Sequence, residues 1–406
     1  MPTNYHIEIQ PRDSLIARDG RPFGAGQGSR MHSLGWLLPS VSAGSIRSLL
    51  GKSAGGFDSV MVQVLKDLEI AGPFPVHEGQ LCFPTPRDAL LLSVGAGKPK
   101  YFPVVPTPLG NGEGTDLPNN LQPCLPSAAP LEESKPPPTP QWWPSKRFFA
   151  WLANSDETPR EMDTGESGFL FATPRETRTH VLIDPKTGTS SDGDLFTTTA
   201  LDLNVAPTSG YSVSAFSLAL RVTAPSSSPL CNHLNALDAL HPLGGERRVV
   251  HWRRDETGAD RWICPARIIE AKERKPQRLR LILVTPAIFA EGWRPGWLQP
   301  MNGSLVGMPP SENDKPAPQL KLVGAVVGRW QPISGWSLEA GKRGIKPLRR
   351  LAPAGSTFFF EVLDGSDPAD WASAHWLSSV CDDAQDRRDG FGLAAWGIWS
   401  PHNLSP

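Results

Sequence analysis

Alternating apolar and polar residues mark several strands along the chain. The segment YHIEIQ (5–10) places Tyr5, Ile7 and Ile9 on one side and polar residues on the other, which is the pattern of a half-buried strand. Longer apolar segments rich in β-branched and aromatic residues predict further strands. These are GYSVSAFSLALRVTA (210–224), RLRLILVTP (278–286), KLVGAVVGRW (321–330), STFFFEVL (356–363) and the C-terminal LAAWGIW (393–399).

Helical periodicity is less frequent. Residues 42–50 place Ile46, Leu49 and Leu50 on one face, and Gly51 ends the pattern. Asp367 followed by Pro368 is a typical start for a helix. Further helices are expected in DSVMVQVLKDLEIAG (58–72), PSKRFFAWLAN (144–154) and CNHLNALDAL (231–240).

Each half of the chain therefore reads as strands interleaved with about two helices, which is a mixed α+β pattern. Two ferredoxin-like folds in tandem fit this count, with an N-terminal domain over 1–225 and a C-terminal domain over 226–406. Other α+β arrangements fit nearly as well. Residues 103–144 contain twelve prolines and little apolar periodicity. We expect there a long loop, disordered in part and without a packed element, inserted into the first domain.

Composition narrows the class of protein. The net charge of the 406 residues is only −1, yet 247–280 carries eleven basic against five acidic groups, and 341–360 carries five basic groups. Local basic blocks of this kind favour contact with a polyanion at one face. No apolar run approaches a membrane span, and the N-terminus lacks the apolar stretch of a signal peptide. We therefore expect a cytoplasmic protein with no membrane partner.

Motifs for common chemistries are absent from the sequence. There is no GxxxxGK[ST], GxSxG or HExxH, and five scattered cysteines without a CxxC spacing disfavour a zinc site. We expect no metal and no cofactor. His32 is the histidine best placed for general acid catalysis of RNA cleavage, although its sequence neighbourhood offers no fixed partner.

Glycine loops beside basic residues recur four times, at 20–30, 244–254, 341–350 and 390–397. Glycine lets a backbone approach a phosphate closely, and arginine grips phosphate with two hydrogen bonds or stacks on a base. Single-stranded RNA requires this mixture of groups. The four loops together predict an extended single-strand binding surface.

Several blocks occur in an order that points to one family. They are PRDSLIARDGRPF (11–23), PSVSAGSIRSLLG (39–51), LGGERR (243–248), GWSLEAGKRGIKPLRRLAPAGSTFFFE (335–361) and DGFGLAAWGIW (389–399). Together they resemble the family of subunit three of the type III-B CRISPR Cmr effector complex, in the branch of the RAMP superfamily that caps the 5′ end of the guide RNA. The Pro-rich segment belongs to none of these blocks.

The resemblance implies a non-catalytic subunit of two ferredoxin-like, RRM-related domains. Such a subunit holds the repeat-derived 5′ handle of the CRISPR RNA and docks against the large polymerase/cyclase-like subunit. The neighbouring backbone RAMP subunits carry the cleavage of target RNA. The matching blocks and the arginine-rich start imply a set of RNA-binding residues. These are Arg21, Arg30, His32, Ser45, Arg47, Arg247, Arg248, Lys342, Lys346, Arg349, Arg350, Gly390, Phe391 and Gly392.

Two alternatives remain open at this point. The chain could be a RAMP endoribonuclease that processes precursor CRISPR RNA, with His32 as the discriminating residue. It could also be an interaction scaffold without RNA contact, because an acidic, Pro-rich middle and fourteen tryptophans suit protein interfaces.

Overall fold

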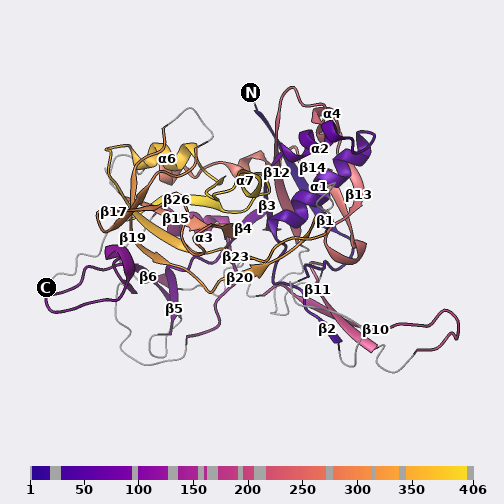
Figure 1. The fold of residues 1–406 in the computed structure, drawn as a ribbon, viewed down its shortest axis with the longest axis horizontal. Helices are drawn as coiled ribbons and strands as arrows, with labels where there is room; N and C mark the ends of the chain where they lie inside the picture. Colours follow the sequence, from indigo (N-terminus) through magenta and orange to yellow (C-terminus); the bar gives the residue numbers. More distant parts are fainter. Residues whose placement is uncertain are drawn as a thin grey trace. The chain divides into compact units, whose positions relative to one another are not determined.

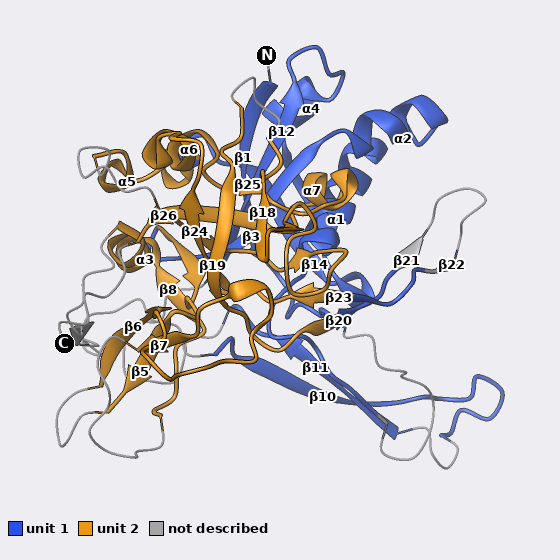
Figure 2. Cartoon of the chain, turned by 60° about the vertical axis from the view of Figure 1, so that its left-hand side comes forward, with its two compact units in different colours: residues 1–79, 172–258, 332–349 blue, residues 80–171, 259–331, 350–406 orange. Residues whose placement is uncertain are grey.

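The computed structural model describes residues 2–18, 29–93, 99–126, 136–153, 160–161, 172–190, 195–204, 216–270, 278–311, 316–337 and 344–399. They belong to two compact units, each assembled from separate stretches of chain (Figures 1 and 2). Unit 1 consists of 1–79, 172–258 and 332–349, and unit 2 of 80–171, 259–331 and 350–406. The units interleave along the sequence, so they do not follow the expected contiguous halves, and that division into two RAMP domains stays a prediction.

Unit 1 is built on an antiparallel sheet in the order β13–β14–β1–β12–β3. Strand β1 lies at its centre and buries Tyr5, Ile7 and Ile9, so the alternation at 5–10 predicted this strand correctly. The strands are β1 (Pro2–Pro11), β3 (Glu69–His77), β12 (Ser217–Pro225), β13 (Asp238–Pro242) and β14 (Val249–Arg254).

Helix α1 packs against β3 and β13 of this sheet. It buries Ile46, Leu49 and Leu50, the face that the periodicity predicted. The helix expected over 231–240 ends early at Asn235, because the residues after it pair with β14 as strand β13. The helical segments of this unit are α1 (Pro39–Ser53), α2 (Ser59–Lys66), α4 (Cys231–Asn235) and the 3₁₀ turn η2 (Gly245–Arg247).

A second, three-stranded sheet of unit 1 has the order β10–β11–β2. Strands β10 (Arg175–Val181) and β11 (Leu195–Leu201) form an antiparallel hairpin, and β2 (Ser29–Met31) runs parallel to β11. Its inner end is closed by a small apolar cluster of Ile16, Met31 and Ala200. Two short strands, β21 (Trp336–Ser337) and β22 (Gly344–Ile345), also pair in this unit.

Unit 2 is built on an antiparallel sheet in the order β17–β18–β19–β24–β15–β26–β25. Its central strand β24 contributes Phe358, Phe359 and Phe360, all fully buried, as expected for STFFFEVL. The strands are β15 (Arg278–Leu283), β17 (Gln299–Met301), β18 (Ser304–Gly307), β19 (Leu320–Val326), β24 (Thr357–Val362), β25 (Ser378–Ser379) and β26 (Leu393–Ile398).

Helices α3 and α6 pack against β26. Helix α6 begins where the sequence predicted, since the Asp367 carboxylate accepts hydrogen bonds from the amides of Ala369 and Asp370. The helical segments of unit 2 are α3 (Ser145–Ala153), α5 (Ala266–Glu270), α6 (Pro368–Ala374), α7 (Ala384–Arg388) and the 3₁₀ turn η1 (Pro118–Asn120), with η3 (Gly258–Trp262) at the sequence boundary between the units.

The expectation that 103–144 contains no packed element was wrong. Val105 packs in a buried cluster with Val323, Phe359 and Trp399, and Trp143 is buried edge-to-face on Tyr101. Short pairs of apolar residues between prolines are enough to form packed strands here. Pro is tolerated at strand ends, and the neighbouring sheet decides which side chains are buried. The additional strands of this part are β4 (Gln80–Pro84), β5 (Ala89–Leu92), β6 (Lys100–Pro106), β7 (Cys124–Pro126), β8 (Trp142–Pro144) and β9 (Arg160–Glu161).

The remaining short strands are β16 (Ala287–Ile288), β20 (Gln331–Ile333) and β23 (Arg349–Ala352), of which β16 and β23 pair antiparallel. Both units thus combine antiparallel sheets with few helices, which confirms the mixed α+β class.

Candidate nucleic-acid interface

Two of the sequence blocks, PRDSLIA and LGGERR, meet in unit 1 although more than 200 residues separate them. The Asp13 carboxylate accepts a hydrogen bond from the amide of Val249 at 2.9 Å, and the carbonyl of Val249 accepts from the amides of Arg12 and Asp13. The amide of Gly245 donates to the carbonyl of Ile16 at 2.8 Å. The start of β14 and the segment after β1 are therefore joined by backbone and carboxylate hydrogen bonds.

The contact between these two segments leaves no room for a side chain at the first glycine of LGGERR. Gly244 has a φ of +82°, and a Cβ at this position would lie 2.4 Å from the carbonyl oxygen of Ile16. The amide of Gly245 is already engaged in the same contact. Gly244 thus serves the approach of two backbone segments, and its structural role accounts for the motif without a phosphate.

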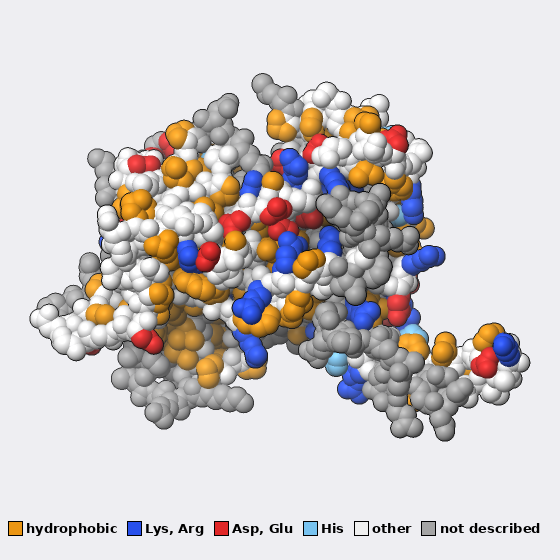
Figure 3. Space-filling view, in the orientation of Figure 1, with side chains coloured by type: hydrophobic (Ala, Val, Ile, Leu, Met, Phe, Trp, Pro, Cys, Tyr) orange, Lys and Arg blue, Asp and Glu red, His pale blue; other side chains and the backbone are white. Residues whose placement is uncertain are grey.

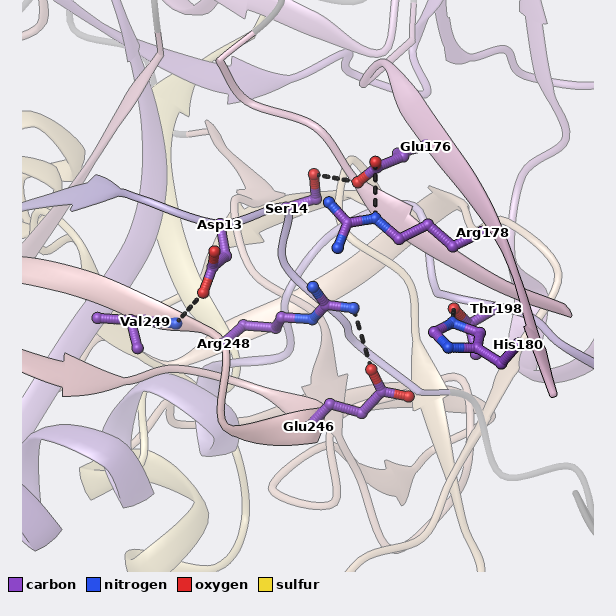
Figure 4. A network of polar contacts seen from close by, with 9 residues as sticks. All are labelled: Asp13, Ser14, Glu176, Arg178, His180, Thr198, Glu246, Arg248 and Val249. Carbon is purple, nitrogen blue, oxygen red and sulfur yellow. Dashed lines mark hydrogen bonds and ion pairs between the residues drawn. The ribbon is translucent and has the colours of Figure 1, made fainter. Parts of the chain in front are cut away.

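A network of polar contacts lines the junction (Figure 4). Glu176 of β10 accepts hydrogen bonds from the Ser14 hydroxyl and from Arg178 Nε, both at 2.7 Å, so it links the hairpin to the segment after β1. The hydrogen bond from Arg178, followed by the one from Ser14, lowers the pKa of Glu176. Across the junction, Arg248 donates to Glu246 at 3.0 Å, and its side chain is only 11% exposed. Arg248 is thereby largely committed to a neighbouring carboxylate.

The hairpin carries a histidine–aromatic pair beyond this network. His180 stacks on Phe196 with 5.1 Å between ring centroids, and its Nε2 lies 2.8 Å from the Thr198 hydroxyl. Sequence reasoning did not select these residues. They face the same side of the sheet as Arg178, because the cross-strand pairs are Arg178–Thr198 and His180–Phe196.

Three other arginines of unit 1 remain available to a ligand. Arg12, Arg30 and Arg247 are exposed, and within the described part of the chain none has a hydrogen bond or ion pair through its guanidinium group. Arg30 lies on β2, and Arg247 lies in the η2 turn, two residues before the start of β14. Arg12 was not among the predicted binding residues, although its place in the arginine-rich start could have suggested it.

His32 follows β2 directly and is half-buried. No described residue forms a hydrogen bond or ion pair with its ring. General acid or base catalysis requires a second group that orients the imidazole or accepts the proton. The described residues supply no such partner here.

Ser45 and Arg47 on α1 are engaged inside unit 1. The Ser45 hydroxyl donates to the carbonyl of Pro242 at 2.5 Å, and Arg47 Nη2 donates to the carbonyl of Leu68 at 2.9 Å. Each bond gives its side chain a structural role that the sequence did not reveal. Arg21 and Lys342 lie outside the described residues.

The C-terminal glycine loop of unit 2 is closed by its own backbone. The amides of Gly390, Phe391 and Gly392 donate to the carbonyls of Arg387, Asp386 and Pro286, at 3.0, 3.1 and 2.8 Å. The Phe391 side chain is fully buried. These three amides therefore already have hydrogen-bond acceptors within unit 2.

The basic residues at 346–350 differ in the exposure of their side chains. Lys346 is exposed, and its backbone amide donates to the carbonyl of Gly335 at 2.8 Å. Arg349 is half-buried. Arg350 is exposed, and its guanidinium carbon lies 5.1 Å from the ring centroid of Trp330.

Two further properties of the described residues concern metal binding and membranes. None of these residues form a group of three or more His, Cys, Asp or Glu side chains arranged to hold a metal ion. Within the same ranges, every helix is too short or too polar to span a membrane.

Comparison with protein families gives a match over nearly the whole chain. Residues 7–399 match the family model described as CRISPR-associated protein (Cas_Cmr3). A search of curated proteins finds no match.

Among solved structures, a chain of the type III-B Cmr-β complex bound to cognate target RNA is 14% identical, with a TM-score of 0.44 over 87% of this chain and 86% of that chain. The same complex with target RNA and AMPPnP gives 12% identity and a TM-score of 0.44 over the same shares. A chain of the apo state gives 11% identity and a TM-score of 0.28, over 63% of this chain and 98% of that chain.

Proposed function

The chain belongs to the CRISPR-associated Cas_Cmr3 family, and on that premise we propose that it is a non-catalytic subunit of a type III-B Cmr effector complex that binds the 5′ repeat-derived handle of the CRISPR RNA. The resemblance found in the sequence is confirmed at the level of the family. We also propose that the chain docks on the large polymerase/cyclase-like subunit, beside a backbone RAMP subunit. Its proposed location is the cytoplasm. The proposal also includes the tandem ferredoxin-like architecture of the two domains.

One observation carries the RNA-binding part of the proposal. The junction of PRDSLIA and LGGERR is held by hydrogen bonds, yet Arg12 and Arg247 within it, and Arg30 on β2, are exposed and have no acidic partners among the described residues. Arginines without a carboxylate partner attract phosphates, and a rigid backbone presents them at defined positions. Arg248, by contrast, already pairs with Glu246, so we expect it to shape the junction more than to bind RNA.

The remaining predicted contacts are proposed on the family blocks that contain them. They are Arg21, His32, Ser45, Arg47, Lys342, Lys346, Arg349, Arg350, Gly390, Phe391 and Gly392.

The test replaces Arg30 and Arg247 together with glutamine and measures the binding of labelled guide RNA in the reconstituted complex at several salt concentrations. Each lost phosphate contact should reduce the slope of log K against log salt by roughly 0.7. Arg253→Gln is the matched control, because Arg253 is an exposed arginine of unit 1 that pairs with Glu8. A double variant with the same slope and the same guide occupancy as Arg253→Gln would refute the role of the two arginines.

The endoribonuclease alternative is tested separately at His32. The purified chain is incubated with a repeat RNA in the presence of EDTA, with His32→Ala as the comparison. We expect no cleavage by either protein, because the imidazole has no partner among the described residues. Metal-independent cleavage that disappears in His32→Ala would establish the alternative and remove the non-catalytic assignment.

A further inference from the structure

Three segments of unit 2 that are distant in sequence bring arginines together with an exposed tryptophan. We call Arg87, Arg329, Trp330 and Arg350 the arginine–tryptophan patch. All four side chains are exposed, and the Trp330 side chain is 50% exposed, which is unusual for so large an aromatic group. Only Arg350 lies in a family block recognised in the sequence.

Close backbone packing holds the segments in place. A Cβ at Gly328 would lie 2.9 Å from Pro353 Cγ and 3.3 Å from Arg87 Nε, so the Arg87 side chain lies directly over the chain leading to Trp330. The amide of Arg87 donates to the carbonyl of Gly355 at 2.8 Å. The patch is therefore positioned by the scaffold and does not depend on long flexible loops.

The charge of the patch is uncompensated within the described residues. The guanidinium groups of Arg87 and Arg329 have neither a hydrogen bond nor an ion pair there. Asp88, the carboxylate adjacent to Arg87 in sequence, is fully buried and pairs with Arg280. In Figure 3, Lys and Arg side chains gather with hydrophobic ones on the face over β23. One arginine over an exposed aromatic ring, with Arg87 packed on Gly328 and Arg329 adjacent in sequence, indicates an anionic ligand with a planar apolar part.

From this arrangement we infer that the arginine–tryptophan patch is a nucleotide-binding subsite for single-stranded RNA, an inference that rests on the proposed function. Trp330 is the surface on which one base stacks. Arg350, with its guanidinium carbon 5.1 Å from the Trp330 ring centroid, reinforces the ring from one side through a cation–π contact. Arg87 and Arg329 bind the flanking phosphates. Stacking makes the subsite tolerant of base identity, because every base presents a π-face.

An acidic protein segment is the competing ligand for three arginines. It would use the guanidinium groups but would gain little from the indole ring, since carboxylates carry no planar apolar surface. Dependence of binding on Trp330 therefore separates RNA from an acidic protein partner.

The experiment measures the binding of the full chain to a fluorescently labelled eight-nucleotide single-stranded RNA by anisotropy. Trp330→Ala should weaken binding roughly 5- to 150-fold, and Trp330→Phe should retain most of the affinity because it keeps a stacking face. Arg87→Gln and Arg329→Gln should each reduce the salt slope by about 0.7. With 5-iodouridine in the RNA, photo-crosslinking should map to Trp330.

Matched controls come from the same unit. Trp293→Ala removes another exposed tryptophan, and Arg267→Gln removes an exposed arginine of α5 that has no ion pair among the described residues. Both controls should bind like the unmodified chain. The thermal unfolding of each variant confirms that it is folded.

The outcomes distinguish this inference from the proposed function. If the unmodified chain binds RNA and Trp330→Ala binds equally well, the subsite is refuted and the proposed function stands. If the unmodified chain binds no RNA, alone or in the complex, the proposed function fails and the subsite with it. If poly-glutamate binding depends on Arg87 and Arg329, while Trp330→Ala leaves the affinity for RNA unchanged, the patch is a protein-docking surface and the inference is overturned.

Discussion

Replacing Arg280 with methionine removes the charge at the centre of a fully buried polar network in unit 2. Arg280 Nη1 pairs with Asp88 Oδ2 at 2.6 Å, and both side chains are 0% exposed. Arg280 Nη2 donates to the carbonyls of Trp151 and Leu152, at 2.6 and 3.0 Å, near the C-terminal end of α3. Asp88 Oδ1 accepts from the Trp151 indole at 3.1 Å and from the Thr357 hydroxyl at 3.4 Å. The network joins three separate segments of unit 2 to α3.

The expected loss follows from what the substitution leaves behind. Asp88 would remain buried without its counter-charge, which typically destabilises a protein by about 3–5 kcal/mol. Two carbonyls of α3 would also lose their donor, and each unsatisfied buried polar group adds roughly 1–3 kcal/mol where water does not enter. For a folded body of 150–250 residues, 3–5 kcal/mol corresponds to a fall in melting temperature on the order of 6–20 °C.

The assay is thermal unfolding followed by tryptophan fluorescence, supported by amide hydrogen exchange in α3. The double variant Asp88→Leu with Arg280→Met should lose at least roughly 2 kcal/mol less than the sum of the two single variants, since it leaves no orphan charge. Arg253→Met is the control for an exposed pair, where we expect a loss of about 0–1 kcal/mol. A loss in Arg280→Met no larger than in Arg253→Met, or a double variant as unstable as the sum, would refute this reasoning.

Two further predictions concern the junction in unit 1. Gly244→Ala should destabilise the chain by about 1–3 kcal/mol, because the backbone there has a φ of +82° and the new Cβ would clash with the Ile16 carbonyl. Thermal unfolding measures this loss of stability, and an unchanged melting temperature would contradict the close packing. Since the pKa of Glu176 is lowered in the folded chain, its link to Ser14 and Arg178 stabilises the junction above the ordinary carboxyl pKa and is lost as the pH falls through the lowered value. The protection factors of the β10 amides, which compare the observed exchange rate with the intrinsic rate at the same pH, should therefore fall in acid. In Glu176→Gln these protection factors should be lower at neutral pH and should depend less on pH; the same fall in acid in the variant would contradict the assignment.

Local signals predicted many elements correctly. The alternation of Tyr5, Ile7 and Ile9 predicted β1, and the Asp367–Pro368 pair predicted the start of α6, because both patterns act within a few residues. The helix expected over 231–240 was overestimated in length. Its last residues pair with β14, and such a pairing overrides local propensity.

The Pro-rich segment shows the opposite error. Its composition predicted a loop without packing, but Trp142 and Trp143 are buried on β8, which pairs with β4. Composition reports the average tendency of a segment, whereas burial depends on which surface lies beside it.

The sequence by itself determined the family, the mixed α+β class and the concentration of arginine and glycine in a few ordered blocks. Each of these is carried by residue types and their order, which exist before the chain folds. Only the tertiary structure decided which groups remain available to a ligand. It paired Arg248 with Glu246, closed the amides of 390–392 on their own unit and brought Arg87 to Trp330. Availability depends on partners contributed by distant segments, and long-range hydrogen bonds leave no periodic pattern in the sequence.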